Sequence, residues 1–366
     1  MGQKYPHYCP PEVRRHLNPV AMGSPRRAGV ALALFMWLSI GAFLLISCGP
    51  ADKPAPPRQL GAWLVYWSAE SGLAELKTHG NLFHQVSLFA YELDETGNPC
   101  PGPGVTKIIP QFLQLAREKG FQPWVTVVND VQYYNHKVLK DKRAFEILLR
   151  DPPVRLAHVR SLAAMVKKNG FTGLTLDYEG LENRQAENYQ TFVRELAQEL
   201  SKDNLGLNVL VEPRRGPLPQ SGTVRLTVMA YNLHGPHSGP GPRATPAFIA
   251  SLGQRAAGDS QGSPAVALAV GGFLWPKGGK VQKVSWDEAF RMAQGAEVGR
   301  SSLDSCPFAR WANHSEMWFE DPVSLQAKWQ AARQAGYHDL WLWHLGDNNK
   351  KLFDWLTQLQ VSQPGR

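Results

Sequence analysis

Cysteine is scarce in this chain, and the four cysteines among its 366 residues stand far apart. Cys9, Cys48, Cys100 and Cys306 form no Cys-x-x-Cys pair, and no group of histidines has the spacing of metal ligands. The pattern of a structural or catalytic metal site is therefore missing. We expect neither a metal nor any other cofactor.

A strong excess of one charge is also missing from the main part of the chain. The net charge is +8, but residues 1–48 carry five Lys or Arg and one Glu, which leaves a net charge of only +4 for the rest. There is no basic stripe interleaved with aromatic residues, the pattern expected of a nucleic-acid-binding surface. We therefore exclude nucleic acid as a partner.

The N-terminal part is typical of a targeting segment. Arg26 and Arg27 precede an apolar run over residues 29–47, as in a secretory signal. The run ends in Leu-Ile-Ser-Cys48, which resembles a bacterial lipobox and implies cleavage before Cys48 and a lipid on its thiol. An uncleaved membrane anchor is the alternative, because 19 apolar residues are just long enough to span a bilayer.

Both alternatives place the bulk of the protein outside the cytoplasm. We expect an exported, cell-envelope membrane lipoprotein on the periplasmic or extracellular face, with translation starting at Met1 or Met22. Residues 49–58 are rich in proline and are predicted to form a tether. An exported compartment permits a disulfide between Cys100 and Cys306, and the sequence leaves open whether they pair or remain free thiols.

The folded part is organised around residues 170–181, which read GFTGLTLDYEGL. Turn residues flank alternating apolar positions, so this stretch is predicted to be a buried strand. Side chains two apart share a face, which puts Thr175, Asp177 and Glu179 on one side and Tyr178 on the other. The two carboxylates either emerge into solvent or act together, because neighbouring carboxylates raise the pKa of one of them, as a general acid requires.

Seven further apolar stretches alternate with predicted helices. The eight predicted strands cover residues 61–67, 85–91, 122–129, 170–181, 205–211, 224–231, 265–271 and 339–345. Apolar residues on both faces favour parallel strands, and the first strand lacks the Gly-rich phosphate loop of a doubly wound sheet. We predict an α/β fold, a (β/α)8 TIM barrel over residues 59–360, with an insertion between strand 7 and helix 7 at about residues 275–317.

In a barrel of this kind, functional side chains lie where the strands end. The residues at those ends are aromatic, amide and carboxylate side chains: Trp67, Tyr91, Asn129, Glu179, Glu212, Tyr231, Asn232 and Trp343. Flat apolar faces and directional polar groups suit a neutral sugar. Any one of these residues alone could be a core, loop or cap residue. Their order at successive strand ends favours a binding site.

Several of these stretches resemble glycoside hydrolase family 18. Residues 172–179 (TGLTLDYE) are similar to its fourth-strand signature, Asp-Gly-x-Asp-x-Asp-x-Glu, with Thr172 and Thr175 in place of the first two Asp. Residues 229–232 (MAYN) resemble its sixth-strand Met-x-Tyr-Asp, with Asn232 in place of Asp. Residues 340–347 resemble its eighth strand. Residues 317–321 (MWFED) are similar to its spore-germination branch, which includes cortex-lytic N-acetylglucosaminidases.

This resemblance, over about residues 58–360, implies retaining hydrolysis of β-linked N-acetylglucosamine bonds, with the substrate's own acetamide as nucleophile. It implies that Glu179 donates the proton, that Asp177 holds the acetamide N–H and that Tyr231 binds its carbonyl. Trp343 would lie beneath the sugar. The other candidate substrate-binding residues are Asn232, Tyr91, Trp67, Asn129, Glu212 and Thr175.

The expected partners are an N-acetylglucosamine-containing glycan and, through the lipid on Cys48, a membrane; the protein is expected to be a monomer. A membrane anchor favours peptidoglycan over chitin, but the sequence decides neither the glycan nor exo or endo cleavage. The alternative function is a non-catalytic glycan-binding lipoprotein on the same barrel. Thr172, Thr175 and Asn232 favour that alternative, and Glu179 argues against it.

Overall fold

The computed structural model describes residues 55–213, 224–257 and 264–361. The predicted signal segment, Cys48 and most of the tether lie outside this part of the chain. No helix within the described ranges is long and apolar enough to cross a membrane.

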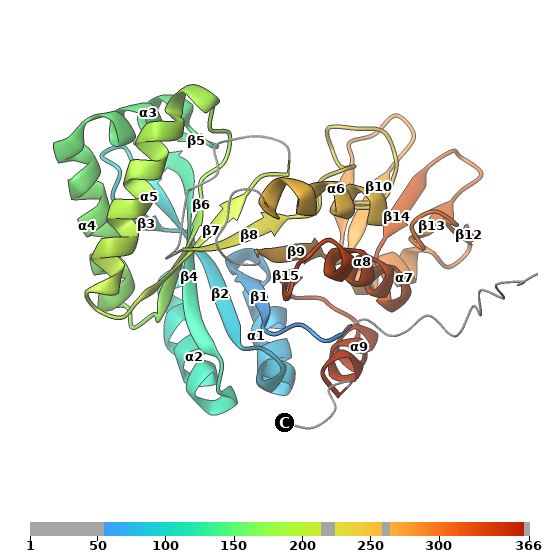
Figure 1. The fold of residues 1–366 in the computed structure, drawn as a ribbon. Helices are drawn as coiled ribbons and strands as arrows, with labels where there is room; N and C mark the ends of the chain where they lie inside the picture. The colour runs from blue at the N-terminus through green and yellow to red at the C-terminus, as the bar shows by residue number, and fades with distance from the viewer. Residues whose placement is uncertain (1–54, 214–223, 258–263, 362–366) are drawn as a thin grey trace, which may run out of the picture. The chain divides into compact units, whose positions relative to one another are not determined.

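Eight parallel strands close into a barrel (Figure 1). Around the barrel they are β1 (Leu60–Val65), β2 (Gln85–Asp94), β4 (Gln122–Gln132), β6 (Gly173–Asp177), β7 (Gly206–Val211), β8 (Arg225–Met229), β9 (Ala265–Ala269) and β15 (Asp339–Leu345). Each strand pairs with the next, and β15 pairs with β1. Two short strands, β3 (Pro99–Pro101) and β5 (Lys137–Val138), run antiparallel to the ends of β2 and β4. The predicted (β/α)8 barrel is confirmed.

Helices surround this barrel and begin and end where local signals predict. Asp321 caps α8 by accepting a hydrogen bond from the backbone N–H of Ser324, with Pro322 in the first turn. Gly120 ends α2 at φ 79°, where a side chain would be strained. The helices are α1 (Ala69–His79), α2 (Val105–Lys119), α3 (Lys142–Arg150), α4 (Pro152–Lys168), α5 (Ala186–Ser201), α6 (Pro246–Ala257), α7 (Trp286–Met292), α8 (Pro322–Gln334) and α9 (Lys350–Val361), with 3₁₀ turns η1 (Tyr66–Ser68), η2 (Gly80–Leu82) and η3 (Asn183–Gln185).

Two tryptophans fill the barrel interior. Trp63 and Trp341 are buried, and their rings lie 4.7 Å apart, centroid to centroid. The interior-facing residues of β9 in the same cluster are small: Ala265, Ala267 and Ala269. A Cβ on Gly61 would lie 2.5 Å from the Trp341 ring, so only glycine fits there. The barrel is therefore a packed core, and a binding site must lie at one of its ends.

The insertion between β9 and α8 forms a second, antiparallel sheet, drawn in orange in Figure 1. Its strands, in sheet order β11-β10-β14-β13-β12, are β10 (Gly272–Trp275), β11 (Gln282–Val284), β12 (Glu297–Arg300), β13 (Pro307–Arg310) and β14 (Glu316–Phe319). The sequence predicts an insertion here but none of these strands. The strands are missed because three or four residues are too few to show alternation.

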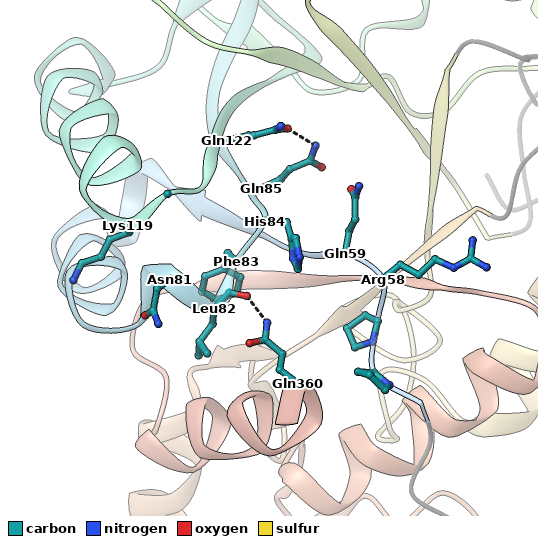
Figure 2. A pocket seen from close by; sticks show the side chains of 13 residues that line it. Arg58, Gln59, Asn81, Leu82, Phe83, His84, Gln85, Lys119, Gln122 and Gln360 are labelled. Atoms are coloured by element: carbon teal, nitrogen blue, oxygen red, sulfur yellow. Dashed lines mark hydrogen bonds between the residues drawn. The ribbon is translucent and has the colours of Figure 1, made fainter. Parts of the chain in front are cut away.

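A cavity of about 510 Å³ lies at the amino-terminal end of the barrel (Figure 2). Its polar side chains bind neighbouring groups of the protein. Gln85 Nε2 donates to Gln122 Oε1 at 2.9 Å, and Gln360 Nε2 donates to the Leu82 carbonyl at 2.6 Å. Arg225 also donates to Gln85. Because barrels of this kind carry their chemistry at the opposite end, we assign these contacts to stability.

Candidate active site

Strand β6 carries two carboxylates to the carboxyl-terminal end of the barrel. Asp177 is its last residue and is 7% exposed, and the side chain of Glu179 is 19% exposed. Tyr178, between them, packs into the core around the barrel, where its hydroxyl lies 2.9 Å from His158 Nε2 on α4. The alternation along the strand therefore delivers Asp177 and Glu179 to the site and anchors Tyr178 behind it.

Asn129 and Glu212 hold the backbone that follows Asp177. The Asn129 side chain donates to the Glu179 carbonyl at 2.9 Å and accepts from the Glu179 N–H at 3.0 Å. Glu212 Oε2 accepts from the Gly180 N–H at 2.8 Å. The sequence places both residues among the substrate-binding candidates. In the structure these contacts position the loop that carries Glu179.

Lys140 is a site residue that the sequence analysis missed. It lies between β5 and α3 in the left-handed region (φ 51°), its N–H donates to Asp130 at 2.9 Å, and its ammonium contacts Glu179 Oε2. Burial raises the pKa of Glu179, while the charge and hydrogen bond of Lys140 lower it. The net direction is upward, so Glu179 keeps its proton to a higher pH than an exposed glutamate.

Asp177 is buried without a full set of partners. Its Oδ1 has no hydrogen-bond partner among the described residues. Burial raises its pKa well above the ordinary value, and the charge of Glu179 adds to this. A buried, unsatisfied carboxyl oxygen is costly unless something binds it. A ligand N–H could occupy this position.

Thr175 lies deeper than its place among the candidates suggests. It is fully buried, and its hydroxyl accepts a hydrogen bond from Ser87 at 3.2 Å. Ser87 is also 2.7 Å from the Thr126 hydroxyl, so β2, β4 and β6 share a hydroxyl cluster inside the barrel. Thr175 therefore belongs to the packed interior beneath the site.

An aromatic floor closes the barrel beneath the site. Its central member is Trp343, half-buried at the end of β15 and joined to His344 by a cis peptide bond. Tyr231 lies nearly parallel to the Trp343 ring, at 6.4 Å between centroids and 18° between planes. Trp67 and Phe89 meet Trp343 edge-on, at 6.4 and 5.2 Å. Trp67 is 48% exposed, so this floor reaches solvent.

Tyr91 does not join this floor. It is buried in the larger core cluster, and Phe89, two residues earlier on β2, packs against Trp343 instead. The pairing of β2 with β4 shifts register between Phe89 and Tyr91, and such a bulge changes which face a residue occupies. Tyr91 therefore packs in the core around the barrel, and Phe89 takes the place at the floor that the sequence suggests for Tyr91.

An open cavity of about 560 Å³ lies beside Glu179. Asn232, which is exposed in the left-handed region (φ 68°), lines it together with Lys140, Glu212 and His237. Tyr231 is buried next to this cavity, and its pKa is raised well above the ordinary value by burial and by the charges of Asp177 and Glu179. Its hydroxyl therefore stays protonated and can donate a hydrogen bond.

The two cysteines of the folded part do not pair. Cys306 is buried in the insertion, where its thiol donates to the Phe319 carbonyl at 3.0 Å. Cys100 lies on β3, half-buried beside β2. Both are free thiols, so the open question from the sequence is decided against the disulfide. The reason is their placement, because each cysteine packs within its own part of the fold.

Residues 95–348 match the family model described as Glycosyl hydrolases family 18. This match contains β6, β8 and β15 and therefore the carboxylates, Tyr231 and Trp343. No curated protein sequence matches the chain.

Solved structures share the fold at low sequence identity. The spore cortex-lytic enzyme SleL from Bacillus megaterium has a TM-score of 0.70 and 14% identity, over 84% of this chain and 75% of that one. A class V chitinase from Pseudomonas fluorescens has a TM-score of 0.70 and 20% identity, over 84% of this chain and 100% of that one. A class V chitinase variant from Nicotiana tobaccum, in complex with NAG4, has a TM-score of 0.67 and 16% identity, over 82% of this chain and 98% of that one.

Proposed function

The chain belongs to glycosyl hydrolases family 18 and is a glycoside hydrolase; from that premise we propose that it cleaves β-linked N-acetylglucosamine bonds by a retaining mechanism that uses the substrate's acetamide. The observation that carries the proposal is the arrangement of a buried carboxylate, Asp177, and a half-buried one, Glu179, at the end of the barrel that the aromatic floor closes. Asp177 has an unpartnered oxygen, and Glu179 lines an open cavity.

Glu179 acts first as the acid. Its pKa is raised, so it keeps its proton to a higher pH than an exposed glutamate and can donate that proton to the glycosidic oxygen as the bond breaks. The carboxylate that remains is next to the Lys140 ammonium, which stabilises the charged form. In the second step this carboxylate accepts a proton from the attacking water. Asn129 keeps Glu179 in place for both steps.

The nucleophile in this scheme is the substrate's acetamide oxygen. The charges of Glu212 and Asp130 act on Glu179, but each carboxylate is already bound by a backbone N–H, from Gly180 and Lys140 respectively. Both carboxylates thus hold backbone around Glu179, and we assign neither of them the role of nucleophile. Asp177 Oδ1 instead accepts the acetamide N–H and aligns the group, which is the substrate-assisted alternative to a two-carboxylate mechanism.

The remaining contacts hold the sugar. Trp343 offers an apolar face beneath the ring, and the protonated Tyr231 hydroxyl donates to the acetamide carbonyl. Asn232 lines the adjoining cavity and takes a polar group of the glycan. Export as a lipoprotein anchored through Cys48 is part of the same proposal, and it rests on the sequence of the N-terminal segment.

Reducing-end release from chitooligosaccharides and purified peptidoglycan tests this function. The full chain is expected to release reducing ends from at least one of the two. Proton NMR of the fresh product is expected to show the β-anomer, because the acetamide shields the opposite face until water attacks. An α-anomeric first product would contradict the mechanism, and glycan binding without turnover would support the non-catalytic alternative.

Substituting Lys140 with Met is expected to move the alkaline limb of the kcat/KM pH profile to higher pH. The ammonium lowers the pKa of Glu179, so its removal raises that pKa and keeps the acid protonated further into the alkaline range. Lys142→Met is the matched control, because Lys142 lies two residues away and pairs with Glu182 at 3.5 Å. A downward shift, or equal shifts in both variants, would contradict the assignment.

A further inference from the structure

Two basic side chains lie beside the aromatic floor and have no part in the mechanism above. Lys283 comes from β11 of the insertion, and its ammonium lies 2.6 Å from His344 Nε2 and 6.0 Å from the centre of the Trp67 ring. Arg243 follows β8 and is 4% exposed, with its guanidinium carbon 5.4 Å from the Tyr231 ring centre and 5.1 Å from that of Phe273.

Neither charge is neutralised by a carboxylate in the described part of the chain. Arg243 donates to the Val270 carbonyl at 3.3 Å, and its Nε has no partner. The carboxylate whose charge acts on Arg243 is that of Glu320, and this carboxylate is already paired with Lys328. A buried cation without a counter-ion is costly, so the arrangement favours an anion supplied from outside.

The partner of Lys283 is an uncharged histidine. His344 Nδ1 lies 2.7 Å from the Leu345 carbonyl, which can only accept, so Nδ1 carries the proton and Nε2 accepts from Lys283. Burial and the Lys283 charge lower the pKa of His344 to about 3, which keeps it neutral. Burial and the charge of Arg243 lower the pKa of Lys283 to about 8, as expected for a cation held near another cation.

A cavity of about 140 Å³ adjoins Lys283, His344 and Trp67. Glu288 and Asp347 also line it, but Glu288 accepts from the Ser285 N–H at 2.8 Å as a helix cap, and neither acid acts on the charge of Lys283. The cavity is large enough for a small acidic substituent on a sugar.

The position of this cluster shows which part of a glycan would meet it. Strand β15, which carries His344, is four strands from β6 in either direction around the eight-stranded barrel. His344, with Lys283 bound to it, therefore lies opposite Glu179 across the floor, and Arg243 lies beside Tyr231. With the glycosidic oxygen at Glu179 and the cleaved sugar over Trp343, the next sugar toward the non-reducing end lies at the cluster.

We propose that Lys283 and Arg243, with the neutral His344 positioning Lys283, form a cationic subsite for a carboxylate-bearing sugar on the non-reducing side of the cleaved N-acetylglucosamine. This inference rests on the proposed function and selects acidic glycans, such as the lactyl-substituted strands of peptidoglycan, over neutral chitin. Lys283, which is partly buried at its ammonium but reaches solvent, makes the direct contact. Arg243 supplies a second, fixed positive charge that acts on Lys283.

The test compares a peptidoglycan-derived tetrasaccharide with the same oligosaccharide whose lactyl carboxylates are methyl esters. The full chain is expected to prefer the free carboxylate by about tenfold or more in kcat/KM, since a hydrogen bond to a charged group contributes on that scale. Lys283→Met is expected to abolish the preference, and Lys283→Arg to retain it. Lys280→Met, an exposed lysine of the same insertion, is the control and is expected to retain it.

The subsite would be refuted if the wild-type protein had nearly equal kcat/KM values for the free acid and the methyl ester. It would also be refuted if Lys283→Met kept the preference for the free acid. Failure of the proposed function looks different, because then no oligosaccharide is cleaved. In that event calorimetric Kd values for the free acid and the methyl ester decide the same question. Tighter binding of the acid that depends on Lys283 would support the subsite, and equal binding would refute it.

Discussion

The Glu179→Gln variant is expected to lose at least about 10²–10⁴-fold in kcat, the range supplied by general acid catalysis. Gln has the same size and can still accept a hydrogen bond from Lys140, so the loop should keep its position. It cannot donate a proton to the glycosidic oxygen or take one from water. Release of reducing ends under saturating substrate measures the loss, and circular dichroism confirms that the variant is folded.

Glu182→Gln is the control for this experiment. Glu182 is three residues away and exposed, and it pairs with Arg184 at 2.9 Å outside the cavity. Its effect on kcat is expected to stay within about threefold, because an exposed ion pair contributes little. If Glu179→Gln retained activity within about tenfold of the wild type, Glu179 would not be the general acid of this chain.

The Lys328→Met variant is expected to lower the free energy of unfolding by about 3–5 kcal/mol. Lys328 on α8 and Glu320 just before it have side chains that are only 2% exposed, and the ammonium contacts both carboxylate oxygens. Without the ammonium, the Glu320 carboxylate stays buried with the Ser324 hydroxyl, which donates to it at 2.7 Å. Urea denaturation monitored by tryptophan fluorescence measures the change.

An exposed ion pair gives the comparison. Lys167 and Asp203 lie 2.5 Å apart with side chains 64% and 41% exposed, so Lys167→Met is expected to change stability by less than about 1 kcal/mol. The double variant Lys328→Met with Glu320→Gln is expected to recover part of the lost free energy of unfolding, because it also removes the buried, unpaired charge of Glu320. If Lys328→Met and Lys167→Met changed the free energy of unfolding equally, burial would not determine how much the Lys328–Glu320 pair contributes to stability.

Local patterns predict the architecture well, because the physics that forms strands and helices acts over a few residues. The strand at residues 339–345 is predicted with the bounds of β15, and Asp321 and Pro322 mark the start of α8. The alternation along β6 correctly puts Tyr178 in the core and Asp177 and Glu179 at the barrel mouth. The short strands of the insertion are not predicted, because three or four residues are too few to show alternation.

Local patterns are weaker guides to what each side chain touches. Glu212 directly follows β7 as predicted, whereas Asn129 lies within β4, which continues to Gln132. Both residues contact the backbone of Glu179 and Gly180, which a spacing rule cannot foresee. Because the pairing of β2 shifts register between Phe89 and Tyr91, Phe89 and not Tyr91 contacts Trp343 at the floor. The disulfide between Cys100 and Cys306 is excluded only by the places that those residues take in the fold.

By itself, the amino-acid sequence determines the barrel, the carboxylate pair at the end of β6 and the aromatic residues at the strand ends, because each of these follows from periodicity along a short segment. Only the tertiary structure decides the electrostatics of the site. Lys140 meets Glu179 across 39 residues of chain, and Lys283 meets His344 across 61. Such contacts depend on how distant loops close over the barrel, and burial then sets the pKa values that chemistry requires.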